Sequence, residues 1–168
     1  MKSDRIKEIT MKKSITLLLL VIVLLFGCVS KDEFLVGDQM SKINNKYTPY
    51  ISLNSLSVYE IDNNYLVVVY DNDTAQKLVE FSSKRKCNRV QGMDLMKKDD
   101  IGQFLNMDAV KLKEKLGQPH ADIGSGFYIP AYITEDAYLI CFEIENGVVF
   151  EVIERDLINN KIVNKISN

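Results

Sequence analysis

Residues 137–154 read AYLICFEIENGVVFEVIE, and this stretch decides the fold of the chain. The runs 137–145 and 148–154 are rich in β-branched and aromatic residues, which favour strands. Asn146-Gly147 lies between the two runs, and this dipeptide is the strongest short signal for a tight hairpin turn. The second run places apolar side chains on both faces and Glu151 on one of them. We therefore predict an antiparallel hairpin with a core on one face and at least partial cover on the other.

Two further elements are predicted upstream of this hairpin. Residues 127–133 favour a third strand, because they combine aromatic and β-branched residues ahead of a polar turn. Asp108 is a good N-cap for a helix, and Gly117 followed by Pro119 is a typical helix end. The C-terminal part of the chain therefore predicts a short helix followed by a three-stranded meander.

Residues 106–119 read NMDAVKLKEKLGQP and resemble the helix motif of the SmpA/OmlA (BamE-like) small lipoproteins and of the β-lactamase-inhibitor-protein-like repeats. In those families a Gly-Met-Thr/Ser start leads to a short helix that ends in Leu-Gly-x-Pro, and a three-stranded antiparallel meander follows. Four positions match this motif, namely Met107, Leu116, Gly117 and Pro119. Asn106, Asp108 and Leu112 depart from it. The resemblance covers residues 99–157 and implies an α+β interaction fold.

The N-terminal part of the chain has a similar plan. Residues 38–46 have the spacing of apolar residues that predicts a helix. Residues 57–61 and 65–70 are strand-like and flank a polar turn, so they predict a hairpin. For residues 76–81 both a strand and the start of a helix fit the pattern, and we favour the strand.

The predicted fold class is α+β, with short helices packed on antiparallel three-stranded meanders. Tyr65-Leu66 and Tyr138-Leu139 open corresponding strands, which favours two tandem helix-βββ halves that share one sheet. Generic meander patterning accounts for this echo equally well. We expect an N-terminal α+β half over residues 38–92 and a C-terminal BamE-like or inhibitor-like half over residues 93–168.

Residues 11–27 have the features of an export signal. Lys12 and Lys13 supply the positive charge at its start, and residues 15–26 form a run that is apolar except for Thr16. That run is too short for a transmembrane helix, which needs about 20 apolar residues, but it fits the apolar region of a signal peptide. Leu25-Phe26-Gly27-Cys28 resembles the lipobox of bacterial lipoproteins, in which the cysteine is diacylated and becomes the N-terminus.

This resemblance implies where the chain is located and how it is anchored. We predict that Cys28 is lipidated, that residues 28–37 are a tether, and that residues 1–10 are an extension that precedes the true start. The protein would then be anchored by lipid to the extracytoplasmic face of the cell membrane. An uncleaved membrane anchor is the alternative.

Charge and cysteine content narrow the possible partners. Residues 1–27 contain five of the 21 basic residues and two of the 23 acidic ones, so the rest of the chain has a formal net charge of −5. A mildly acidic domain without clustered cations does not fit nucleic acid as a partner. Lys84-Arg85-Lys86 is a short basic patch that we interpret as a solvated face. Once Cys28 is assigned to the lipid, Cys87 and Cys141 are the only possible disulfide pair, and their spacing does not decide whether they meet.

The most distinctive polar segment is the loop 118–126. A hydrolase would use Ser125 as nucleophile, His120 as base and Asp122 as the group that orients the base. The segment lacks the glycine spacing of a nucleophile elbow and runs from helix to strand, so we do not expect catalysis. We favour structural roles for this loop, with Gly124 and Gly126 allowing unusual dihedrals and Asp122 or Ser125 capping exposed amides; contact with a partner is the alternative. Five residues of the loop are candidates for contact with a partner: His120, Asp122, Gly124, Ser125 and Gly126.

The sequence therefore predicts a membrane-tethered, non-enzymatic interaction module that binds an envelope protein. We expect no catalytic residues, no cofactor and no metal site, because one histidine beside Asp122 falls short of the three or four ligands that zinc needs. A small hydrolase that uses the loop 118–126 is one alternative. A structural or ligand-sensing accessory lipoprotein is the other.

Overall fold

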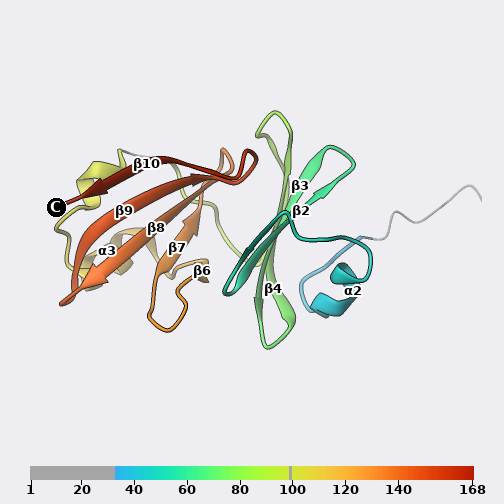
Figure 1. The fold of residues 1–168 in the computed structure, drawn as a ribbon, viewed down its shortest axis with the longest axis horizontal. Coiled ribbons are helices and arrows are strands. Elements are labelled where there is room, and N and C mark those ends of the chain that lie inside the picture. The colour runs from blue at the N-terminus through green and yellow to red at the C-terminus, as the bar shows by residue number, and fades with distance from the viewer. Residues whose placement is uncertain (1–32, 99) are drawn as a thin grey trace, which may run out of the picture. The chain divides into compact units, whose positions relative to one another are not determined.

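The computed structural model describes residues 33–98 and 100–168, and in this part of the chain the fold is mostly β. Strands β1 to β10 form two antiparallel five-stranded sheets, one from each half of the chain (Figure 1). Each strand pairs with its neighbours in sequence, so both sheets are simple meanders. Cys28 and the whole predicted signal, residues 11–27, lie outside the described residues, as does the predicted extension 1–10.

The first sheet follows a five-residue helix, α2 (Met40–Asn44). Its strands are β1 (Ile51–Leu53), β2 (Leu56–Ile61), β3 (Asn64–Asp71), β4 (Thr74–Ser82) and β5 (Cys87–Gln91). The turns Asp62-Asn63 and Asn72-Asp73 join β2 to β3 and β3 to β4, and all four residues have positive φ. Asn and Asp tolerate this left-handed conformation better than other residues with a side chain, so these polar pairs favour tight hairpins. The predicted hairpin and the preference for a strand over residues 76–81 are confirmed.

The second sheet follows a 3₁₀ turn, η1 (Ile101–Phe104), and the helix α3 (Ala109–Leu116). Its strands are β6 (Ala121–Asp122), β7 (Pro130–Ile133), β8 (Tyr138–Glu145), β9 (Val148–Asp156) and β10 (Lys161–Ser167). Asn146-Gly147 joins β8 to β9, with Glu145 opposite Val148 at the turn. The hairpin predicted over residues 137–154 is therefore confirmed.

Helix α3 begins and ends where the sequence predicts. The Asp108 carboxylate accepts hydrogen bonds from the backbone N–H groups of Val110 (2.8 Å) and Lys111 (3.3 Å), so it caps two amides that have no partner within the helix. Gly117 ends the helix with a positive φ of 78°. Leu112 is the fully buried residue of the helix, whereas Leu116 is partly buried against the same core.

Replacing the N-cap Asp108 by alanine should lower the free energy of unfolding by about 1 kcal/mol, the usual cost of losing a helix cap. Urea denaturation of the full chain measures this change. Glu114→Ala is a matched control, because Glu114 is an exposed acid in the middle of the same helix. Equal effects of the two substitutions would contradict the capping role.

Three hydrophobic clusters hold the sheets and helices of residues 34–168 together in layers. The largest lies between the two sheets and includes Val58, Val67, Ala131 and Leu139. A second joins the far face of the first sheet to α2, and a third joins the far face of the second sheet to η1 and α3. Each sheet is thus covered on both faces. This double cover explains why the middle strands are continuous apolar runs rather than alternating ones.

The predicted α+β fold class is wrong. The two halves do not share one sheet of three-stranded meanders, because each half forms its own five-stranded sheet. Four strands that the sequence did not indicate account for the difference, namely β1, β5, β6 and β10. All four lie at sheet edges. Edge strands are often short or polar, as the mostly exposed β10 is, so their hydrophobic periodicity is weak.

The folded unit begins earlier than the predicted tether allows. Phe34 is buried in the cluster beneath α2, and its ring packs edge-on against Tyr47 with centroids 5.9 Å apart. Gly37 donates a backbone hydrogen bond to the carbonyl of Ala75 in β4. The part of the predicted tether 28–37 from Phe34 onward is therefore packed on the first sheet.

Candidate functional site

The candidate loop connects α3 to β7, and its tip spans residues 123–129 between β6 and β7. Strand β6 consists of two residues, with Ala121 opposite Ala131 and Asp122 opposite Pro130. Because β6 is the edge of the second sheet, the tip projects from an edge hairpin. Two side chains, those of His120 and Asp122, fix the base of this hairpin.

His120 is buried, with 7% of its surface exposed. Its ring Nδ1 accepts a hydrogen bond of 2.7 Å from the backbone N–H of Ile133, and the backbone N–H of His120 donates to the carbonyl of Ala131. Burial and the nearby Lys77 ammonium lower the pKa of His120 to about 4, although a hydrogen bond with the backbone of Asp94 opposes them. The imidazole is thus neutral at pH 7, and its Nδ1 lone pair is occupied, so it anchors the loop to β7.

Lys77 of β4 holds the same region from the first sheet. Its ammonium group donates to the backbone carbonyls of Pro119 (3.0 Å) and His120 (2.8 Å). Desolvation by burial lowers the pKa of Lys77. The segment that enters the loop is thereby connected to both sheets.

Asp122 closes the loop on itself. Its carboxylate Oδ1 accepts from the backbone N–H groups of Gly124 (3.0 Å) and Ile129 (2.9 Å), one on each side of the tip. Ser55 of the β1–β2 turn donates its hydroxyl to the Asp122 carbonyl at 2.6 Å and accepts from the Asp122 N–H at 3.1 Å. The predicted capping role of Asp122 is confirmed.

The tip of the loop depends on its glycines. A Cβ atom on Gly124 would lie 1.6 Å from the carbonyl oxygen of Phe127, a contact with backbone that no side-chain movement relieves. Gly126 has a positive φ of 92°, as the expected unusual dihedrals require. Ser125 lies exposed between the two glycines. The loop therefore has one compact backbone path that only glycine permits.

This path leaves two aromatic side chains in solvent. Phe127 is 65% exposed and Tyr128 is 55% exposed. The sequence predicted a strand over residues 127–133, which includes both, but strand β7 begins only at Pro130. The signal that was available is their position between Gly126 and Pro130, two residues that favour loops.

The structure does not bring His120, Asp122 and Ser125 together as the hydrolase alternative requires. In the described part of the chain, the hydrogen bonds of the His120 ring and the Asp122 carboxylate go to backbone groups rather than to each other or to Ser125. A relay needs the base oriented by the acid and bonded to the nucleophile. Within the same residues, 33–98 and 100–168, no group of three or more His, Cys, Asp or Glu side chains is arranged to hold a metal ion.

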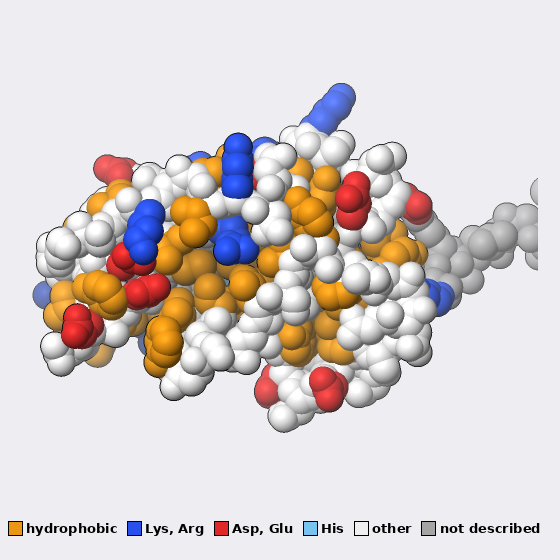
Figure 2. Space-filling model, viewed as in Figure 1, with side chains coloured by type: hydrophobic (Ala, Val, Ile, Leu, Met, Phe, Trp, Pro, Cys, Tyr) orange, Lys and Arg blue, Asp and Glu red, His pale blue; other side chains and the backbone are white. Residues whose placement is uncertain are grey.

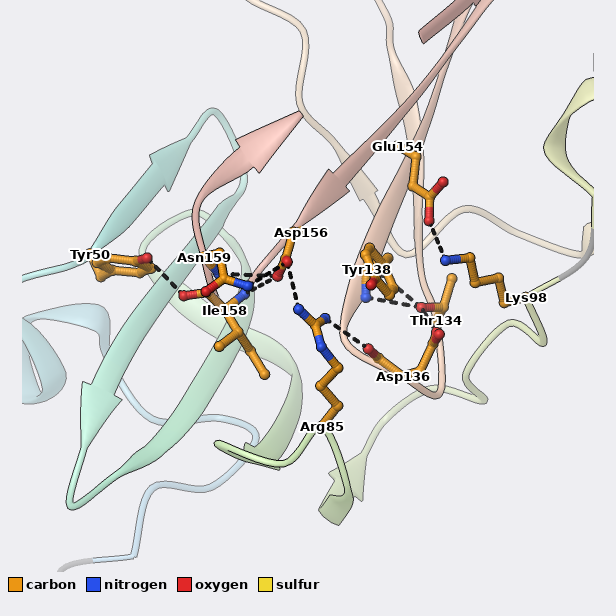
Figure 3. Close-up of polar contacts among 10 residues, drawn as sticks. All are labelled: Tyr50, Arg85, Lys98, Thr134, Asp136, Tyr138, Glu154, Asp156, Ile158 and Asn159. Atoms are coloured by element: carbon orange, nitrogen blue, oxygen red, sulfur yellow. Dashed lines mark hydrogen bonds and ion pairs between the residues drawn. The ribbon is translucent and has the colours of Figure 1, made fainter. Parts of the chain in front are cut away.

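A second polar cluster joins the two sheets (Figure 3). The Asp156 carboxylate, at the end of β9, accepts from the Arg85 guanidinium (2.5 Å), the backbone N–H groups of Ile158 and Asn159, and the Asn159 side-chain amide. Burial alone would raise the pKa of Asp156, but these donors lower it to about 2. Arg85 comes from the β4–β5 turn of the first sheet, so this bond ties that sheet to the second.

Cation–π contacts extend this cluster around Tyr138. The Arg85 guanidinium lies 4.6 Å and the Lys98 ammonium 3.7 Å from the centre of the Tyr138 ring. Lys98 also pairs with the largely buried carboxylate of Glu154 at 2.5 Å. Arg85, interpreted from the sequence as part of a solvated face, is in fact a specific inter-sheet contact. Each cation in the cluster already has a carboxylate partner, so the cluster is structural rather than a site for an anion.

The two described cysteines are free thiols. Cys141 lies in the core between the sheets, where burial raises the pKa of its thiol to about 12. Cys87 opens β5 and is partly buried, and burial also raises its pKa. Both thiols are therefore protonated at neutral pH and are weak nucleophiles.

Comparison with known proteins adds no assignment. No protein-family model, no curated protein and no solved structure matches the chain. The resemblance of residues 106–119 to BamE-like lipoproteins and inhibitor-like repeats therefore stays a prediction. Among the described residues, no helix has both the length and the apolar character that crossing a membrane requires.

Proposed function

We propose that the chain is an extracytoplasmic lipoprotein, anchored through Cys28, whose β domain is a non-enzymatic binding module for a protein of the cell envelope. The binding element is the tip loop, residues 123–129. The observation that carries the proposal is the exposure of Phe127 and Tyr128 on a loop whose backbone is fixed by Asp122 and Gly124. A resident cofactor or metal plays no part in this function.

Large exposed aromatic side chains are the usual energetic centres of protein interfaces. A rigid loop binds with a smaller loss of conformational entropy than a mobile one, because its order is already present in the free protein. Burial and, to a smaller extent, the nearby Asp122 carboxylate raise the pKa of the Tyr128 phenol. Tyr128 therefore stays neutral and presents a hydroxyl together with an apolar ring.

The mixture of apolar, acidic and basic side chains on the surface fits a protein partner. On the face drawn in Figure 2, hydrophobic side chains lie over both halves of the view, and acidic and basic side chains are scattered among them. A surface without a single dominant charge does not attract a polyanion over long range. Short-range apolar contacts of the kind that Phe127 offers would then supply most of the affinity.

Site-specific photo-crosslinking tests the proposal in cells that express the full chain. A benzophenone amino acid at Phe127 should yield one discrete adduct with a partner, whereas the same probe at Val110 should not. Val110 is the matched control because it is also 65% exposed but lies on α3.

The partner identified in this way allows a binding measurement. Phe127→Ala should weaken its binding at least about tenfold, the loss of about 1.4 kcal/mol that separates an energetic centre from a neutral contact. Val110→Ala should leave binding unchanged. Adducts of equal yield from both positions, or full binding by the Phe127 variant, would contradict the assignment of the tip loop.

A further inference from the structure

The first turn of the folded unit carries two exposed aliphatic side chains. The Asp38 N–H donates to the Leu35 carbonyl at 3.1 Å, which defines a turn over residues 35–38, and Gly37 has a positive φ of 95°. Leu35 is 46% exposed and Val36 is 43% exposed. The tight turns of the adjacent sheet are instead Asp-Asn and Asn-Asp pairs, the polar composition that turns normally have. The composition of this turn is therefore the exception.

Every backbone amide of this apolar turn has a partner. The N–H of Leu35 donates to the Asp38 carboxylate (2.9 Å), that of Val36 to the Gln91 side chain (3.3 Å), and that of Gly37 to the Ala75 carbonyl (2.8 Å). Ala75 in turn donates to the Asp38 carbonyl at 2.9 Å. A segment that enters an apolar medium must satisfy its backbone polar groups internally, and the amide N–H groups of this turn are all satisfied in this way.

The charge and packing of the turn also suit it to contact with an apolar surface. The Asp38 carboxylate pairs with the Lys42 ammonium at 2.8 Å, so the turn brings no unpaired charge of its own to an apolar surface. Phe34, immediately before the turn, is buried in the cluster beneath α2. The two aliphatic side chains are thus held outward on a fixed backbone.

We propose that Leu35 and Val36 insert into the interfacial region of the membrane that holds the lipid anchor. This inference rests on the proposed lipidation of Cys28. Leu35 lies seven positions after Cys28, and the chain between the two residues spans at most about 25 Å whatever its conformation. The lipid surface is therefore within reach of the turn. Apolar contact next to an acyl chain adds to the anchor, since stable membrane attachment usually needs more than one signal.

Tryptophan fluorescence tests this contact, because the chain contains no tryptophan. Leu35→Trp and, as control, Val110→Trp are made in the full chain and reconstituted into vesicles of phosphatidylcholine and phosphatidylglycerol. Some vesicles also contain a lipid with a nitroxide quencher near its headgroup. The Leu35 variant should emit at shorter wavelength in vesicles than in detergent-free buffer and should lose intensity with the quencher, whereas the Val110 variant should do neither. Val36→Trp repeats the test if the first variant misfolds.

Mass spectrometry of the same samples shows whether Cys28 is acylated, and so separates the hypothesis of the lipid anchor from that of the membrane contact. Acylated protein whose tryptophan at position 35 or 36 still emits as in water overturns the membrane contact and leaves the anchor standing. Equal quenching at positions 35 and 110 overturns it as well, because no particular surface would then face the lipid. Protein without an acyl group on Cys28 overturns the anchor, and the contact that rests on it falls with it.

Discussion

Asp156→Ala is expected to lower the free energy of unfolding by about 3 to 5 kcal/mol, the cost of removing one partner of a buried ion pair. The substitution leaves the Arg85 guanidinium without its carboxylate and deprives the amides of Ile158 and Asn159 of their acceptor. The Asp156 side chain is only 3% exposed and Ile158 is buried, so water replaces few of these bonds, although it reaches the Arg85 side chain, which is 27% exposed. Chemical denaturation of the full chain measures the loss.

Glu145→Ala is the control for this prediction, because Glu145 is an exposed acid in the same sheet. Its effect should stay within about 0.5 kcal/mol, as for most surface substitutions. A double-mutant cycle with Arg85→Ala should show that the two losses are not additive, since both remove the same contact. Additive losses, or an Asp156 variant as stable as the Glu145 control, would exclude the network as an inter-sheet tie.

The acid sensitivity of this network follows from the pKa of Asp156, which is about 2 in the folded chain against an ordinary value of 3.8. A depressed carboxyl pKa stabilises the fold above the unfolded value and ceases to do so as the pH falls through the folded one. The Asp156 contribution is therefore complete above about pH 4 and disappears towards pH 2.

His120 is expected to make the domain lose stability at a higher pH than Asp156 does. Its pKa is about 4 in the fold against 6.5 when unperturbed, so the unfolded chain binds the proton more tightly. The free energy of unfolding should then fall as the pH drops from about 6.5 towards 4, by about 3 kcal/mol in total. Below the folded pKa both states are protonated and this term stops changing.

The chain has a single histidine, so its imidazole signals can be followed by NMR without ambiguity. In the folded protein they should not titrate between pH 8 and pH 5. His120→Gln should remove the difference in unfolding free energy between pH 7 and pH 5.5 that this residue causes. An imidazole that titrates near pH 6.5 in the folded chain would show that the ring is not held neutral in the core.

The sequence predicted the turns and helix ends that are determined by residues close to one another in the chain. Asn146-Gly147 specifies its turn because glycine and asparagine adopt positive φ at little cost, and Asp108 specifies the start of α3 because its carboxylate reaches two amides of the first turn. Asp122 caps the amides of its own loop for the same reason. Each of these contacts spans seven residues or fewer.

Features that depend on distant residues escaped prediction. The contact between Arg85 and Asp156 joins positions 71 apart, and neither residue has a neighbour in sequence that indicates the other. Phe127 and Tyr128 are a different case, because their composition favours a strand although their position between Gly126 and Pro130 was a local signal for a loop. Tertiary context overrides intrinsic β-propensity at such positions.

The meander order of both sheets has a consequence for how the chain folds. Every strand pairs with a strand that is adjacent in sequence, so hairpins can form one after another without closing long loops. The contacts that join the sheets span far more of the chain, 42 residues for Lys77 with Pro119 and 108 for Tyr50 with Ile158. We therefore expect docking of the two sheets to be slower than formation of the hairpins, and their apolar inner faces would be open to aggregation until docking is complete.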